Sequence, residues 1–330
     1  MKRVYDDFKM TSKYLTWCER FLSYLKNKKE RCNNMKAIFE SVIGNLKLLK
    51  IPFGTDWTGV VLVDDEKKIL IDSGALADDV DNVLIPALRE EGYTLNDIDY
   101  LVNTHSHGDH IGGYARILEL APNITVVAAD SDRKNVENPA ALAIRTRGKY
   151  PAVSPVPQSY LKGVSVDLVL KEGEELANIL TLIETPGHDS GCVCWYDKKT
   201  KTIITGDSLQ GNGTDAQGIG FYQSLDSYRG SLLKLLDSDV ENILCGHNYD
   251  QIGYWVEGKE ASTAALQRCL ARTEFYQKFV DDELAAGNTE PEKIAERLIR
   301  QHGCGVPSYL FMAVYKVCEH IRHSSFKSEM

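Results

Sequence analysis

The residues best suited to carry chemistry lie in one short segment, Thr104 to Gly113, with the sequence THSHGDHIGG. Three histidines and an aspartate fall within six positions, and imidazole and carboxylate groups are the usual protein ligands of zinc, iron and manganese. His105 and His107 are two residues apart, so in an extended segment both side chains point to the same side and can approach one ion. Asp109 and His110 follow where a helix is predicted to begin, and they can turn toward a second position. The segment therefore predicts a metal site.

Similar residues follow other predicted strands of the chain. An isolated pair of histidines would carry little weight, but here five of the eight histidines and two aspartates stand directly after strands. In an α/β sheet the strand ends at one edge lie side by side, and ligand sites form there. Four separate segments are thus expected to deliver ligands to one edge. The first predicted ligands of these four segments are His105, His188, Asp207 and His247.

The elements that must position these residues read as short strands alternating with amphipathic helices. Two β-branched runs, 58–63 and 68–72, are joined by Asp-Asp-Glu-Lys and predict a hairpin. Apolar residues at helical spacing over 80–88 predict a helix, ended by Gly92. The stretch 131–163 contains four prolines and is predicted to be a loop that covers a site or is partly disordered. Further strands are predicted at 99–103, 124–128, 164–170, 179–183, 201–205 and 242–245.

Charge and patterning divide the chain into three parts. Residues 1–34 carry nine basic and four acidic side chains and are therefore positively charged. Because the whole chain has a net charge of −9, the remaining residues have a net charge of −14. This basic leader is interpreted as a solvated or disordered tail, or as a segment outside the native protein if Met35 is the true start. Residues 35–254 are predicted to form the catalytic domain. Residues 255–330 carry apolar stripes at helical spacing and are predicted to form a C-terminal helical extension.

The composition is that of an ordinary soluble globular chain. Of the 330 residues, 43% are hydrophobic and 26% are charged, as in ordinary soluble domains. No apolar run is long enough to span a bilayer, and the first residues do not resemble a secretory signal. The eight cysteines are expected to be reduced thiols of a cytoplasmic protein. The acidic balance argues against nucleic-acid or membrane partners.

Together, the motifs resemble those of metallo-β-lactamase-fold hydrolases. THSHGDHIGG is similar to the THxHxDHxGG signature, and TPGHDSG, ITGDSL and CGHN resemble the later motifs in the same order, over residues 53–250. The resemblance implies an α/β fold, a four-layer αββα sandwich of two mixed sheets with helices outside. It also implies two metal ions bridged by Asp207. The first would be held by His105, His107 and His188, and the second by Asp109, His110 and His247.

The resemblance implies a metal-dependent hydrolase. Two divalent ions would share a hydroxide that attacks a carboxylic ester, thioester or lactone, and Asp109 would orient that hydroxide or shuttle its proton. Zinc is the expected metal, although iron and manganese suit the same ligands. Glyoxalase-II-like thioesterases combine this ligand set with a helical C-terminal region, as this chain does. Two other branches remain as alternatives, a mononuclear iron persulfide dioxygenase and a phosphodiesterase or nuclease.

The substrate is expected to be a small molecule, and its contacts are less well defined. Several residues near the motifs could line the site mouth or receive a substrate carboxylate, although packing or surface roles would explain each of them. The helical extension is expected either to pack back on the sandwich or to form a homodimer interface. The candidate substrate residues are Trp57, Arg145, Arg147, Tyr222, Asn248 and Tyr249.

Overall fold

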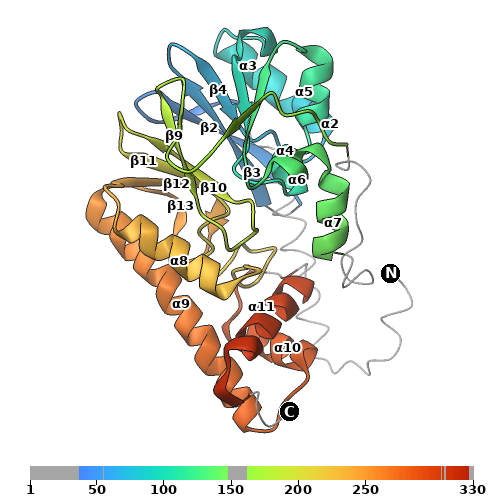
Figure 1. Ribbon diagram of the computed structural model, residues 1–330, viewed down its shortest axis with the longest axis vertical. Coiled ribbons are helices and arrows are strands. Elements are labelled where there is room, and N and C mark those ends of the chain that lie inside the picture. The colour runs from blue at the N-terminus through green and yellow to red at the C-terminus, as the bar shows by residue number, and fades with distance from the viewer. Residues whose placement is uncertain (1–36, 55, 148–161, 306, 308–309, 327–330) are drawn as a thin grey trace, which may run out of the picture.

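The computed structural model describes residues 37–54, 56–147, 162–305, 307 and 310–326. The basic leader and Met35 lie outside these described residues. The chain forms two sheets that face each other, with helices on their outer sides and further helices toward the C-terminus (Figure 1). The predicted four-layer sandwich with a helical extension is confirmed.

The first sheet contains seven strands in sequence order, β1 to β7. Strands β1 to β4 pair antiparallel, and β3 and β4 form the predicted hairpin. Strands β4 to β7 then pair parallel, which brings their carboxyl ends to one edge. The strands are β1 Glu40–Ile43, β2 Leu46–Phe53, β3 Asp56–Asp64, β4 Lys68–Ile71, β5 Tyr100–Val102, β6 Thr125–Ala129 and β7 Leu168–Leu170.

The second sheet has the strand order β13-β12-β11-β10-β9-β8. Its strands pair antiparallel except for β11 and β12, which run parallel and therefore also end side by side. Both sheets are thus mixed. The strands are β8 Glu175–Leu176, β9 Leu180–Glu184, β10 Val193–Asp197, β11 Thr202–Gly206, β12 Asn242–Tyr249 and β13 Gly253–Val256.

The helices cover the outer faces of the sheets and build the extension. Those between β4 and β7 are α2 Ala77–Asp79, the π-helical turn η1 Val80–Leu84, α3 Ile85–Glu90, the 3-10 turn η2 Leu95–Asp97, α4 Gly108–Ile111, α5 Tyr114–Leu120, α6 Arg133–Glu137 and α7 Pro139–Arg147. Those of the C-terminal half are α8 Leu225–Leu236, α9 Lys259–Ala285, α10 Pro291–His302 and α11 Leu310–His323.

Three apolar layers hold the two sheets and their covering helices together. One lies between the first sheet and α3 and α5, with Leu62, Leu101 and Ile117 fully buried. The second lies between the two sheets and includes Trp195, and the third lies between the second sheet and α8 and α9 and includes Tyr228. Because strand side chains alternate between the two faces of a sheet, each sheet contributes to two of these layers.

Two predicted elements differ from the structure. The segment predicted to be a loop contains α6 and α7, and residues 148–161 lie outside the described part. Pro139 is the first residue of α7 and not a helix breaker, since a proline at the first helical position lacks an N–H that would be unpaired there anyway. Strand β12 also continues to Tyr249, so His247 lies within the strand and not after it.

The helical extension has an apolar core of its own. Tyr276, Val280, Leu298 and Val317 from α9, α10 and α11 are fully buried in it or nearly so. The predicted apolar stripes therefore pack against one another within the chain. The homodimer interface and the domain boundary near residue 255 remain predictions. In the described residues, no helix combines the length and apolarity needed to cross a membrane.

A buried histidine links this extension to the sandwich. The ring of His320 is bonded on both sides, with Nδ1 2.9 Å from Gln277 Oε1 and Nε2 2.6 Å from the Tyr222 hydroxyl. Because the amide oxygen only accepts, Nδ1 must carry the proton and Nε2 must accept from the tyrosine. Burial lowers the pKa of His320 to about 3, with a further contribution from Lys316. The folded protein therefore holds this imidazole neutral.

The depressed pKa of His320 predicts an acid-sensitive stability. Between about pH 3 and the ordinary histidine value of about 6.5, the unfolded chain binds more protons than the folded chain, so stability falls as pH falls through that window. Within it, the wild type is expected to lose about 1.4 kcal/mol per pH unit more than His320→Gln. Urea unfolding of chelator-treated protein between about pH 4 and pH 7 measures this difference. His323→Gln, from the same helix, should follow the wild type. Parallel curves for the wild type and His320→Gln would contradict the prediction.

Candidate metal centre

Parallel strand pairing gathers polar residues at one edge of the sandwich. Strands β4, β5 and β6 end side by side, and the residues that follow include Asp72, His105 and Asp132. In the second sheet β11 leads into Asp207, and its parallel neighbour β12 carries His247. Because both sets of strand ends open to the same side, seven histidine and aspartate side chains from four segments come together.

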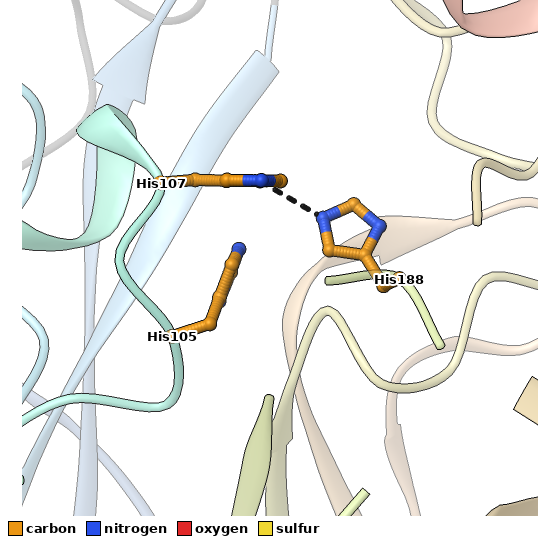
Figure 2. A group of neighbouring side chains, drawn as sticks. All are labelled: His105, His107 and His188. Atoms are coloured by element: carbon orange, nitrogen blue, oxygen red, sulfur yellow. Dashed lines mark hydrogen bonds between the residues drawn. The ribbon is translucent and has the colours of Figure 1, made fainter. Parts of the chain in front are cut away.

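The first group consists of His105, His107 and His188, whose nitrogens lie within 4.8 Å of one another. Figure 2 shows the three rings converging from the loop after β5 and from the loop after β9. His107 Nδ1 and His188 Nε2 are 3.0 Å apart. His105 and His188 are fully buried or nearly so. Three nitrogens at such separations can hold one ion.

The second group consists of Asp109, His110 and His247, which also lie within 4.8 Å of one another. Asp207 stands between the two groups. Its Oδ2 is 3.4 Å from His188 Nε2, whereas its Oδ1 is 3.3 Å from His110 Nε2 and 3.4 Å from His247 Nε2. The two oxygens of one carboxylate thus face the two groups, as the resemblance to the family implies for a bridging ligand.

Outer partners fix the orientation of the rings. His188 Nδ1 is 2.9 Å from the carbonyl oxygen of Phe221, and His247 Nδ1 is 2.7 Å from that of Trp57. Carbonyl oxygens only accept, so both Nδ1 atoms donate, and Nε2 is the nitrogen that each ring can offer to a metal ion. His110 Nδ1 is likewise 2.8 Å from Asp72 Oδ2. This is the arrangement in which an outer acceptor fixes the tautomer of a metal-binding histidine.

Three aspartates outside the predicted ligand set support the centre. Asp72 accepts from the Thr104 amide and hydroxyl, both at 2.8 Å, as well as from His110. Asp189 Oδ2 lies 3.5 Å from His107 Nε2. Asp132 accepts from Asn103 and Ser106, each at 2.6 Å, and so holds both sides of the His105 loop. Burial raises the pKa of Asp132 to about 7, although its hydrogen bonds oppose the rise.

Two glycines let the chain approach the centre closely. A Cβ at Gly112 would overlap the carbonyl oxygen of Ala75, and one at Gly206 would overlap the Thr104 side chain. Gly206 also has a φ of +49°, a region that glycine enters without steric cost. Gly112 thus lets the segment after His110 pack closely against the backbone of Ala75.

The donor set fits a divalent metal. His105 Nε2, His110 Nε2 and Asp207 Oδ1 are buried and have no hydrogen-bond partner within the described residues. Buried polar atoms are rarely left without a partner, and a cation between them would supply one. Burial opposes protonation of His247, but Asp207 and Asp109 raise its pKa to about 9. The carboxylates thus create a negative site that suits positive charge, and the mixed imidazole and carboxylate donors suit zinc, iron or manganese.

Two of the candidate substrate residues, Tyr222 and Trp57, have buried rings. Tyr222 was expected in the wall of the site, but its ring is fully buried and stacks on Tyr228 with centroids 4.6 Å apart. Trp57 was expected at the site mouth, but its ring packs edge-on against Tyr254 between the sheets, with centroids 5.4 Å apart. The backbone carbonyl of Trp57 accepts a hydrogen bond from His247 Nδ1 and so helps to orient that ring. A sequence pattern does not show which way a large ring points, and direct substrate contact by Tyr222 and Trp57 remains a prediction.

The other four candidates lie on α7 and β12. Tyr249 is buried beside His247, and its hydroxyl accepts from Gln210 Nε2 at 3.2 Å. Arg145 is exposed on α7 and donates to Asn135 Oδ1 at 3.2 Å. Arg147 ends α7, and Asn248 is exposed on β12. Direct substrate contact by these four residues remains a prediction.

A cleft opens beside the first group. His107 lies in its wall together with residues of α7, α11 and the segment before α8, so the helical extension borders the centre. Its described lining includes Leu142, Ala143, Phe221, Phe311 and Met312.

Comparison with known proteins agrees with the motifs and the fold. The hydroxyacylglutathione hydrolase of Methylococcus capsulatus is 27% identical over 239 residues, which cover 69% of this chain and 77% of that protein. That of Rhodopseudomonas palustris (strain BisA53) is 33% identical over 192 residues, 57% of this chain and 63% of that protein. A metallo-beta-lactamase family protein of Thermus thermophilus superposes with a TM-score of 0.65 at 18% identity, covering 86% of this chain and 95% of that one. The family model of the metallo-beta-lactamase superfamily matches residues 57–247. The chain therefore belongs to the metallo-beta-lactamase superfamily.

Proposed function

We propose that the protein is a metal-dependent hydrolase of carboxylic thioesters or esters of small molecules. The observation that carries the proposal is the position of Asp207, whose two oxygens face two separate groups of metal-binding side chains. His105, His107 and His188 would hold one ion, and Asp109, His110 and His247 the other. The relatives named hydroxyacylglutathione hydrolase support thioesters as the first substrates to test.

The residues of the chain have separate tasks in this reaction. Divalent ions bound there would supply Lewis acidity and a water that loses a proton near neutral pH. Although burial would raise the pKa of Asp109, His110 and His247 hold it well below the usual range. Asp109 is therefore a carboxylate that can orient a water at the second group. In the overall hydrolysis, a C–O bond forms between water and the acyl carbon, the C–S or C–O bond breaks, and the leaving group takes the proton.

A substrate panel tests the proposal. Chelator-treated protein, reconstituted separately with zinc, iron and manganese, is assayed on thioester, lactone, phosphodiester and persulfide substrates. Thioester or ester hydrolysis is expected only after metal is returned, with zinc as the most active metal. Oxygen uptake with one iron per chain would instead indicate a persulfide dioxygenase. Turnover of phosphodiesters alone would indicate a phosphodiesterase. Either of these two outcomes would overturn the proposal.

A further inference from the structure

The cleft beside His107 is lined mainly by apolar residues that are not candidate metal ligands. One wall is α7, which contributes Leu142 and Ala143, and the opposite wall is α11, which contributes Phe311 and Met312. Leu142 and Phe311 are almost completely buried at this boundary. The cleft thus lies between the sandwich and the helical extension, with the proposed metal ligand His107 along its wall.

The lining is apolar over most of its surface. Apart from His107, the described residues that border the cleft carry no ionisable side chain; its polar side chains are the hydroxyls of Ser106 and Thr146. The Ser106 hydroxyl is directed to Asp132. Arg145 of α7 does not border the cleft, and its exposed side chain donates to Asn135 Oδ1 at 3.2 Å. A charged substrate portion would lose its hydration in this cleft, where the described lining other than His107 offers no charged partner, and that loss is costly.

Phe221 connects this wall to the centre. Its backbone carbonyl accepts from His188 Nδ1 at 2.9 Å, and its ring packs edge-on against the His188 imidazole, with centroids 5.2 Å apart. The same ring contacts Phe311 of α11, with centroids 6.3 Å apart. The apolar wall is therefore continuous with the residues that orient a proposed metal ligand, and a group seated in the cleft lies next to the reacting position.

We infer that this cleft binds an uncharged, apolar acyl chain, so that the substrates are acyl thioesters or esters selected by their acyl part. The inference rests on the proposed hydrolase function and specifies its substrate class. Burying one methylene group contributes about 0.8 kcal/mol, which corresponds to roughly a fourfold gain in kcat/KM for each added carbon. The gain ends where the chain fills the cleft.

The test uses straight-chain thioesters of N-acetylcysteamine, a neutral thiol, from acetyl to octanoyl, with the zinc-reconstituted full-length protein. We expect kcat/KM to rise roughly fourfold per carbon over the first members. Met312→Trp, which fills the cleft, should lower kcat/KM for hexanoyl far more than for acetyl. Ile144→Trp is the matched control, because Ile144 lies on α7 and is 64% exposed, and it should behave as the wild type.

A binding measurement separates this inference from the proposed function. Calorimetry with N-acyl ethanolamides, which resist hydrolysis, should show the same dependence on chain length in protein without turnover. Hydrolysis with no dependence on chain length would overturn the apolar-cleft inference and leave the hydrolase intact. Chain-length-dependent binding without hydrolysis of any ester would support the cleft and contradict the proposed function.

Discussion

Replacing Asp207 by alanine is expected to remove metal and activity together. Asp207 is buried between the two groups, and its oxygens face His188 on one side and His110 and His247 on the other. Loss of an outer partner of a metal ligand typically costs 10- to 100-fold in affinity or activity. Loss of a carboxylate shared by both groups should exceed this, so kcat/KM is expected to fall by about 10³-fold or more.

The variants for this test separate charge from shape. Asp207→Asn keeps the volume of the side chain and removes its charge, and it should lose metal almost as completely as Asp207→Ala. Asp226→Ala removes an aspartate from the surface of α8, where its side chain is 83% exposed, and should keep wild-type metal content and turnover. Unfolding curves of the metal-free proteins show whether each variant still folds. A folded Asp207→Ala protein with full activity would show that this carboxylate is not a ligand.

The second large effect is expected at Asp72, a residue outside the predicted ligand set. Its carboxylate accepts the Thr104 amide, the Thr104 hydroxyl and His110 Nδ1, all at 2.8 Å. Asp72→Ala leaves these buried donors unpaired, which costs about 1–3 kcal/mol per group. It also releases the His110 ring, so metal affinity is expected to fall by about 10- to 100-fold.

Asp72→Asn tests the tautomer of His110 directly. Asparagine tolerates the backbone of this position, where φ is +64°, and its oxygen can still accept from the Thr104 amide. Its NH₂ group would then face His110 Nδ1 and favour a proton on Nε2, the atom that must bind metal. Metal affinity from chelator competition should fall as in Asp72→Ala, with a smaller loss of folding stability.

Asp197→Asn is the matched control for this substitution. Asp197 is also fully buried, but it accepts from the Lys199 amide at 3.0 Å and the Thr200 hydroxyl at 2.6 Å, away from the centre. Its replacement should change stability without changing metal affinity. Wild-type metal affinity in Asp72→Asn would contradict a role for Asp72 in fixing His110.

The metal-binding side chains could be predicted because their signal is local. His105, His107, Asp109 and His110 lie within six positions, and each of the other segments follows or continues a recognisable apolar run. The supporting aspartates could not be predicted in the same way. Asp72 faces His110 only because β4 pairs parallel with β5, and the sequence does not show which strands become neighbours. Its one local signal was its place at the end of a predicted strand, before Ser73 and Gly74.

The walls of the cleft depend still more on tertiary structure. The prolines in 131–163 predicted a loop, whereas Pro139 begins the helix that carries Leu142. Met312 of α11 lines the same cleft, although it is about 170 positions away in the chain. Periodicity identified α11 as a helix, but only the packing of the extension on the sandwich determines that part of it borders the metal centre.

Metal titration of the wild type and Asp207→Ala, with activity followed in the same samples, tests the central claim most directly. Chelator-treated wild-type protein should be inactive, should gain thioester hydrolysis as zinc is added, and should reach its maximum when two ions are bound per chain. Asp207→Ala should bind less metal and remain at background activity throughout. Full hydrolysis by wild-type protein that contains no metal would contradict the claim that these seven side chains form a catalytic metal centre.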